Sequence, residues 1–336
     1  MTLPRAGRTR RTYPIPVIAM ITVTLMSLVA CTGGPRSGAG ETEVKPPPDR
    51  PAELPSDRGV GPVALGYVAG GVSYVVLESG EHYLVPGDLR QGGRATLSPE
   101  GRWLLRGDTL YDTENGRTTT VALAAAPRSW SPNGRWMLTE CSSEGAGSRQ
   151  QRLDTTAGST LDVAGLPSTE DEVCGAYAVL DDGNVVTAVL PAGSGPVREV
   201  ALQVLDPQTG GVVRQIDVDL TSILQAEESV VGWLGLHGLL AGPDGEFFLG
   251  VMGGVNRSTI GVVIADDGRP VRRVEGPAGG GWVPVAFDDE GIVVVHGDDG
   301  NGAQVSVVAP DGAIHLRHHL PPGAQLVLVP GRGITI

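Results

Sequence analysis

The sequence predicts an all-β protein, a β-propeller of six blades with four antiparallel strands in each blade. Two kinds of tight turn alternate strictly from Val60 onward, and short apolar runs separate them. Two hairpin turns per unit imply four strands per unit, which is the size of a propeller blade. No stretch shows a sustained apolar period of 3.6 residues, so we expect no helical layer.

The first kind of turn follows an aromatic or apolar strand and joins the two inner strands of a unit. It occupies residues 98–101, 131–134, 181–183, 242–245, 289–291 and 329–333. The second kind joins the two outer strands, at residues 78–80, 114–116, 156–158, 208–210, 266–268 and 310–312. Proline presets φ, Asp or Asn hydrogen-bonds to its own backbone and glycine adopts positive φ, so each sequence suits a tight hairpin.

The ends of the chain predict how the ring closes. Residues 324–336 contain only a turn of the first kind, and residues 63–86 contain only a turn of the second kind. We therefore expect the two termini to share one blade, with the C-terminal strands inside the N-terminal ones, because open sheet edges are avoided. Five or seven blades and a two-sheet sandwich are the alternatives, and the alternation of the turns favours six blades.

Two units resemble a known family. LSPEGRWL at residues 97–104 and WSPNGRWM at residues 130–137 are similar to the Ser-Pro-Asp-Gly-aromatic core of TolB-type, WD-repeat-like propeller blades. The resemblance implies the propeller fold and a binding role for it. The chain departs from the family because Gly-His and Trp-Asp pairs are missing, and because no α/β domain is expected ahead of the propeller. TolB's own role is therefore not implied.

The N-terminus predicts export and a lipid anchor. Arg5, Arg8, Arg10 and Arg11 precede a mostly apolar stretch that is short for a transmembrane helix. Leu28-Val29-Ala30-Cys31 resembles the bacterial lipoprotein box, so we expect residues 1–30 to be a signal peptide and Cys31 to be lipidated. An ordinary signal peptide is the alternative, and residues 9–13 also fit a twin-arginine signal.

The remaining organisation follows from composition and charge. Residues 31–59 are rich in glycine, proline and charge and predict a disordered tether, with the propeller in residues 60–336. The formal net charge is −13, and without residues 1–30 there are 21 basic against 38 acidic residues. We therefore expect no nucleic-acid partner and membrane contact only through the lipid, on the outer face of the bacterial cell membrane.

Loop lengths predict which side of the ring binds. The tight turns lie on one side, whereas the long polar stretches 141–151, 191–200, 253–259, 297–303, 165–174 and 220–232 belong to the other. Long loops carry variable residues suited to binding, although mobile filler is the simpler explanation for any single loop. The candidate residues on these loops are Glu144, Arg149, Glu170, Asp171, Arg198, Glu227, Glu228, Arg257, Asp298 and Asp299.

The cysteines predict one disulfide. Cys141 ends a strand of one unit and Cys174 begins the next unit, both on the long-loop side. Once Cys31 is lipidated these are the two remaining thiols, and an exported protein meets an oxidising compartment. We expect a Cys141–Cys174 bridge, with two buried free thiols as the alternative.

The search for catalytic chemistry finds little. The chain contains no G-x-S-x-G, P-loop, H-E-x-x-H, C-x-x-C or dinucleotide fingerprint. His315, His318 and His319 are expected on an exposed outer strand, with His318 on the opposite face from the other two. Asp298 and Asp299 resemble part of a calcium loop but lack its other ligands, so we expect no metal and no cofactor.

These observations predict a non-catalytic module that binds an envelope protein or a small ligand. The alternative is an envelope hydrolase or lyase with acidic residues at the mouth of the propeller channel, because propeller enzymes gather catalytic groups from separate blades. Carboxylates or histidines converging on the channel would favour the enzyme, whereas an apolar channel would favour binding.

Overall fold

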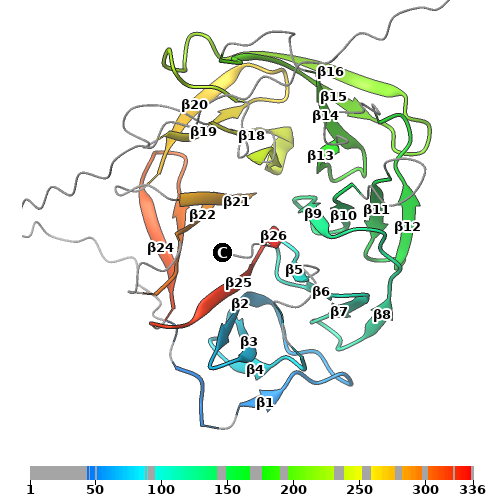
Figure 1. Cartoon of the computed structure of the whole chain (residues 1–336), viewed down its shortest axis with the longest axis vertical. Helices are drawn as coiled ribbons and strands as arrows, with labels where there is room; N and C mark the ends of the chain where they lie inside the picture. The colour runs from blue at the N-terminus through cyan, green and yellow to red at the C-terminus, as the bar shows by residue number, and fades with distance from the viewer. Residues whose placement is uncertain are drawn as a thin grey trace, which may run out of the picture. The chain divides into compact units, whose positions relative to one another are not determined.

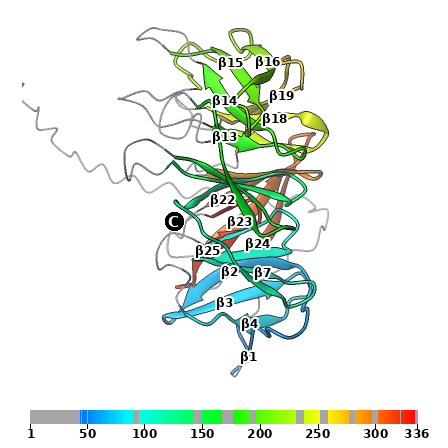
Figure 2. The same ribbon diagram turned by 90° about the vertical axis from the view of Figure 1, so that its right-hand side faces the viewer.

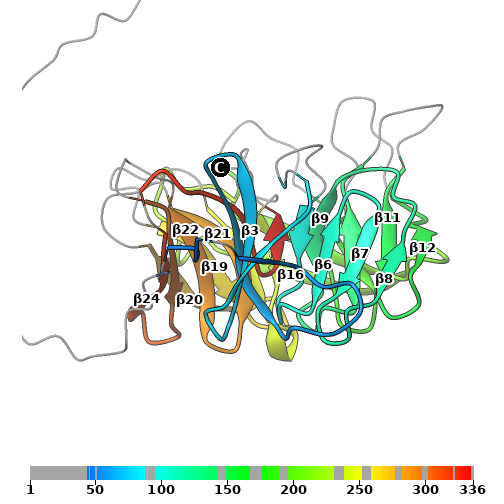
Figure 3. The same ribbon diagram turned by 90° about the horizontal axis from the view of Figure 1, so that it is seen from below.

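The computed structural model describes residues 44, 46–49, 51–87, 89, 95–141, 149–166, 176–189, 196–230, 238–251, 259–276, 282–296, 302–320 and 322–333. All of them lie within the compact unit Ala39–Ile336. Six antiparallel sheets follow one another around a central axis in this unit, which confirms the six-bladed propeller (Figure 1). Figures 2 and 3 show the same blades from the side.

Five blades are built from consecutive strands, with the first strand innermost. Blade β5–β8 contains β5 (Ala95–Leu97), β6 (Trp103–Arg106), β7 (Thr109–Asp112) and β8 (Thr118–Thr120). Blade β9–β12 contains β9 (Pro127–Trp130), β10 (Trp136–Thr139), β11 (Gln151–Asp154) and β12 (Ser159–Asp162). Blade β13–β16 contains β13 (Ala176–Val179), β14 (Val185–Val189), β15 (Glu199–Leu205) and β16 (Val212–Asp219).

The next two blades repeat the same order. Blade β17–β20 contains β17 (Leu240–Ala241), the short 3-10 helix η3 (Pro243–Gly245), β18 (Phe247–Gly250), β19 (Thr259–Ile264) and β20 (Pro270–Glu275). Blade β21–β24 contains β21 (Trp282–Asp288), β22 (Gly291–His296), β23 (Gln304–Val308) and β24 (Ile314–His319). Every predicted tight turn falls between the two strands that it was expected to join.

The sixth blade closes the ring with both ends of the chain, as predicted. Its sheet order is β1 (Ala52–Glu53), β4 (His82–Leu84), β3 (Val72–Leu77), β2 (Val63–Ala69), β25 (Gln325–Val329) and β26 (Arg332–Gly333). Figure 1 shows the red strand β25 beside the blue strand β2. The N-terminal part supplies one strand more than its single predicted turn implied, because a second turn at Gly70 and Gly71 joins β2 to β3.

The predicted tether ends earlier than expected, because its last part packs on the ring. Ala52–Glu53 pair in parallel with β4, and Val44, which is 5 % exposed, donates its amide to the His319 carbonyl at 3.2 Å. We call the described residues between 44 and 61 the strap. In Figure 1 it runs in blue from beside β24 to β1. Composition predicted disorder here, and backbone pairing with β4 overrides it.

The core consists of six clusters of buried apolar side chains, one at each seam between neighbouring blades. Because strand side chains alternate between the two sheet faces, each blade contributes to two seams. Val200, for example, faces blade β17–β20, whereas Leu205 faces blade β9–β12. The alternation fixes which residues are left to face solvent where the seams open outward.

Candidate binding face and central channel

The two sides of the ring differ in the length of their connections. We call the side with the predicted tight turns the tight-turn face and the opposite side the long-loop face. On the long-loop face, the second and third strands of a blade are joined by 2 residues in blade β5–β8 and in the closing blade. The same connection has 11, 9, 8 and 7 residues in the other four blades, in chain order. The predicted asymmetry is therefore confined to one arc of the ring.

Several predicted site residues lie outside the described residues. They are Glu144, Glu170, Asp171, Arg257, Asp298 and Asp299, together with Cys31 and Cys174. Cys141 is described and lies two residues after β10, at the long-loop end of its blade. The Cys141–Cys174 bridge stays a prediction.

Arg198 and the segment 220–230 come together, although they lie on different predicted loops. The Arg198 guanidinium donates to the Ala226 carbonyl, and the Val197 amide donates to the Ser229 hydroxyl at 3.0 Å. The Val230 amide in turn donates to the Val197 carbonyl at 3.0 Å. These contacts fix the connection after β16 against the start of β15, so part of the long-loop face is a defined surface.

Glu228 is not the solvated loop charge that the sequence predicted. Its side chain is 1 % exposed and accepts from Arg273 of β20 at 2.8 Å and from the Gln225 amide at 2.8 Å. Breaking such a buried pair strands a charge in the interior, so Glu228 holds the segment 220–230 onto the next blade. Glu227, its neighbour, is exposed as predicted.

Arg149 is also paired within its own blade. Its Nε donates to the Asp162 carboxylate at 2.7 Å, and both side chains are about half exposed. Gln151 donates to the same carboxylate at 3.1 Å. The hydrogen bond from Arg149 is the main cause that lowers the pKa of Asp162. Arg149 therefore belongs to the rim of the long-loop face and is not drawn toward the axis.

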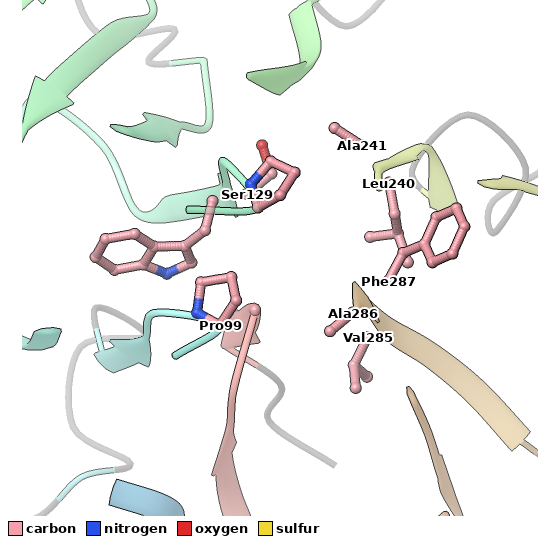
Figure 4. A pocket seen from close by; sticks show the side chains of 10 residues that line it. Pro99, Ser129, Leu240, Ala241, Val285, Ala286 and Phe287 are labelled. Atoms are coloured by element: carbon pink, nitrogen blue, oxygen red, sulfur yellow. The ribbon is translucent and has the colours of Figure 1, made fainter. Parts of the chain in front are cut away.

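The central channel is apolar where the structure describes it. Figure 4 shows Leu240, Val285 and Ala286 on one side of the axis, facing Pro99 and Ser129 on the other. The remaining lining residues are Trp130, Pro132, Ala241, Phe287 and Gly331. The space between them is about 10 Å³, which is close to the room needed for one water molecule. No titratable side chain lines this part of the channel.

A larger hollow lies at the long-loop end of blade β13–β16, and the sequence analysis did not identify it. It is an open groove of about 510 Å³ over β14, β15 and β16. Glu199, Asp217 and Asp219 line it together with the aliphatic side chain of Val189. The alternate acidic positions at the end of an expected outer strand were visible in the sequence, but their facing partner Glu199 becomes clear only from the register.

The histidines of β24 are arranged differently from the prediction. A β-bulge leaves Arg317 without a partner, so His315 pairs with Val307 and His318 with Val305, on one sheet face. Burial lowers the pKa of His318 to about 4, and the charge of Arg317 acts in the same direction. Among the residues with described positions, no three His, Cys, Asp or Glu side chains gather in a way that could hold a metal ion.

Comparisons with known proteins agree on the fold alone. No protein-family profile matches the chain, and no curated protein matches it. TolB from Acinetobacter baumannii has a similar structure, with TM-score 0.46 and 14 % identity over 82 % of this chain and 68 % of that one. A putative TolB from Agrobacterium tumefaciens gives TM-score 0.40 and 16 % identity over 83 % and 100 %.

An enzyme is among the similar structures as well. Oligogalacturonate lyase from Vibrio parahaemolyticus gives TM-score 0.38 and 13 % identity over 77 % of this chain and 73 % of that one. Similar propellers thus occur in proteins with different activities, and fold alone does not assign one. In the described part of the chain, no helix is long and apolar enough to span a membrane.

Proposed function

We propose that this chain is an exported, lipid-anchored binding module of the bacterial cell envelope, whose long-loop face contacts an envelope protein. Cys31 carries the lipid, and residues 1–30 are removed on export. The apolar, nearly filled channel is the observation that carries the proposal, because it offers no acid, base or nucleophile where propeller enzymes gather them.

The distribution of connections supports the long-loop face as the contact surface. Four consecutive blades extend their connections on that face, while the tight-turn face keeps short turns throughout. Arg198 and Glu228 show how parts of that face are held in place by neighbouring segments, at the Ala226 carbonyl and at Arg273. A preorganised surface loses less conformational entropy when a partner binds.

The hydrolase or lyase alternative would require carboxylates near the axis. Of the acidic candidates with described positions, Glu228 is committed to Arg273 and Glu227 lies on the same outer connection. Neither lines the described channel. The binding module therefore accounts better for the arrangement.

The test is crosslinking in intact membranes followed by purification of the chain. Wild type is compared with Cys31→Ala, which blocks lipidation, and with a variant whose residues 141–150 are replaced by the two-residue Gly-Asp connection of blade β5–β8. We expect one envelope protein to be recovered with wild type and lost with both variants. Equal recovery with the shortened variant would exclude this loop as the contact, and recovery of no specific protein from wild type would overturn the proposal.

A further inference from the structure

The groove over β14, β15 and β16 contains an unfavourable arrangement of charge. Glu199 and Asp219 are direct cross-strand partners, and Asp217, two residues from Asp219, is the partner of Ala201. All three acidic residues are exposed and line the same groove. Like charges placed directly opposite each other on a sheet destabilise it.

The described arginines of this blade do not relieve the repulsion. Arg198 donates to the Ala226 carbonyl, and Arg214 lies 3.8 Å from Asp266 of the next blade. The hydrogen bonds of the acidic side chains come from uncharged groups: Asp217 accepts from Gln215 Nε2 and Asp219 from the Thr221 amide, each at 2.8 Å. The bonds from Thr221 lower the pKa of Asp219, so its carboxylate stays ionised.

The groove also exposes an aliphatic side chain. Val189 is 49 % exposed at the end of β14, whereas Val185, Val186 and Thr187 of the same strand are buried. Val189 pairs with Ala201 across the sheet, so the two form an apolar floor beside the acidic side chains. The combination offers contacts to an aliphatic group and to cations on either side of it.

We propose that this groove binds a segment of a partner protein in which arginine or lysine side chains flank an aliphatic side chain. The inference rests on the proposed function and names the chemistry of the partner on one part of the long-loop face. Cations supplied by the partner offset the repulsion between Glu199 and Asp219, and the aliphatic group covers Val189. Complementary charge also speeds encounter with a basic partner.

The test uses two fluorescent hexapeptides and the propeller of this chain with its strap. The first peptide alternates arginine and valine, and the second alternates arginine and serine. We expect wild type to bind the first more tightly than the second. We expect the triple variant Glu199→Gln, Asp217→Asn and Asp219→Asn to weaken binding of the first by about tenfold.

A matched control separates the groove from the overall negative charge. The variant Glu78→Gln, Glu81→Gln and Asp289→Asn removes three exposed carboxylates from elsewhere on the ring and changes the net charge equally. We expect it to change the affinity by less than about twofold. Equal weakening by both triple variants, equal binding of both peptides, or no binding by wild type would overturn the groove proposal.

A second measurement needs no ligand. Because Glu199 faces Asp219, Glu199→Gln alone should raise the midpoint of thermal unfolding by about 1–3 °C. A lower midpoint would show that the charges are compensated in the free protein and would overturn the inference. Membrane crosslinking that survives the groove variant would reject this groove and leave the proposed function standing.

Discussion

Blades β5–β8 and β9–β12 are close copies on one face of the ring and differ on the other. In each, a buried serine hydroxyl accepts the backbone amide of a tryptophan, Ser98 from Trp103 at 2.9 Å and Ser131 from Trp136 at 3.0 Å. The arginine before each tryptophan stacks on its ring, at 4.8 Å in the first blade and 4.6 Å in the second.

The shared network extends to the outer strands. Arg102 binds Asp112 at 2.9 Å, and Arg135 binds Asp154 at 3.2 Å. Each aspartate also accepts backbone amides of the following turn. These contacts lock the two turns of a blade to each other, so the repeated sequence encodes the tight-turn face.

The opposite ends of the same strands follow no such rule. The connection after β6 has 2 residues, Gly107 and Asp108, whereas the connection after β10 has 11. Gly107 adopts φ of 57°, which glycine allows and which makes the short turn possible. The comparison teaches that one face of each blade maintains the frame while the other is free to lengthen and to acquire contacts.

The largest expected difference between the copies concerns their tryptophans. Trp136 is 9 % exposed, lies 4.0 Å below Arg152 and donates Nε1 to the Asp181 carbonyl at 3.1 Å, whereas Trp103 is half-buried. We expect Trp136→Ala to lower the free energy of unfolding by about 3–5 kcal/mol and Trp103→Ala by about 2 kcal/mol. Urea unfolding measures both, and equal losses would show that the seams beside the two blades are equivalent.

The second difference is Cys141, which occupies the position of Asp108 in the other copy. If Cys141 is bridged to Cys174, Cys141→Ser should lower the free energy of unfolding by about 3–4 kcal/mol, because the bridge restricts the unfolded chain. Alkylation of the denatured protein, with and without a reductant, is followed by mass spectrometry. Labelling of both thiols before reduction would contradict the bridge.

A smaller effect should distinguish the two aspartates. Asp112 is 3 % exposed and accepts two bonds from Arg102 as well as one from Asn115, whereas Asp154 accepts a single bond from a more exposed arginine. We expect Asp112→Ala to cost about 2–3 kcal/mol and Asp154→Ala about 1 kcal/mol. Urea unfolding of both variants is the check, and the reverse order would mean that the carboxylate of Asp154 holds its turn more strongly.

The smallest expected effect is a pH dependence that one copy has and the other lacks. Glu100 packs so close to the next turn that a Cβ added to Gly134 would lie 1.9 Å from its Oε2. This desolvation raises the pKa of Glu100 from 4.5 to about 7, against the hydrogen bond from Ser98 and the charge of Arg102. Asn133 takes the same place in the second copy and carries no charge.

The sign of the effect follows from the raised pKa. The protonated form favours folding, so the contribution of Glu100 is complete below about pH 4.5 and is lost as the pH rises through about 7. Because the residue is largely exposed, solvent weakens the effect. Glu100→Asn should flatten the fall in the urea midpoint between about pH 6 and pH 8. An unchanged slope would assign the pH dependence to another group.

Much of this frame could be predicted from the sequence because tight turns are written in local residue types. Proline, aspartate and glycine at fixed offsets identified both turns of every blade and the shared closing blade. The turn at Gly70 and Gly71 was missed because it lacks those companions, and the strap was missed because proline and charge are also typical of a tether.

The candidate site was harder to predict because it depends on partners that are distant in sequence. Glu228 reads as a solvated charge until Arg273, 45 residues away, is placed against it. The groove depends on strand register, and the faces of His315 and His318 depend on a bulge. Composition and periodicity carry neither register nor bulges.

The strap also decides how the ring would bear a mechanical load. A pull on the N-terminus first meets the contact between Val44 and His319, then the pairing of β1 with β4 and the bond from Leu54 to Leu84. The bonds from Val60 and Gly61 to Thr113 follow, before the tension reaches β2 and its pairing with β25. The strap would therefore peel away contact by contact, as a strain relief protects the joint behind it, and the closure would be the last part to feel the force.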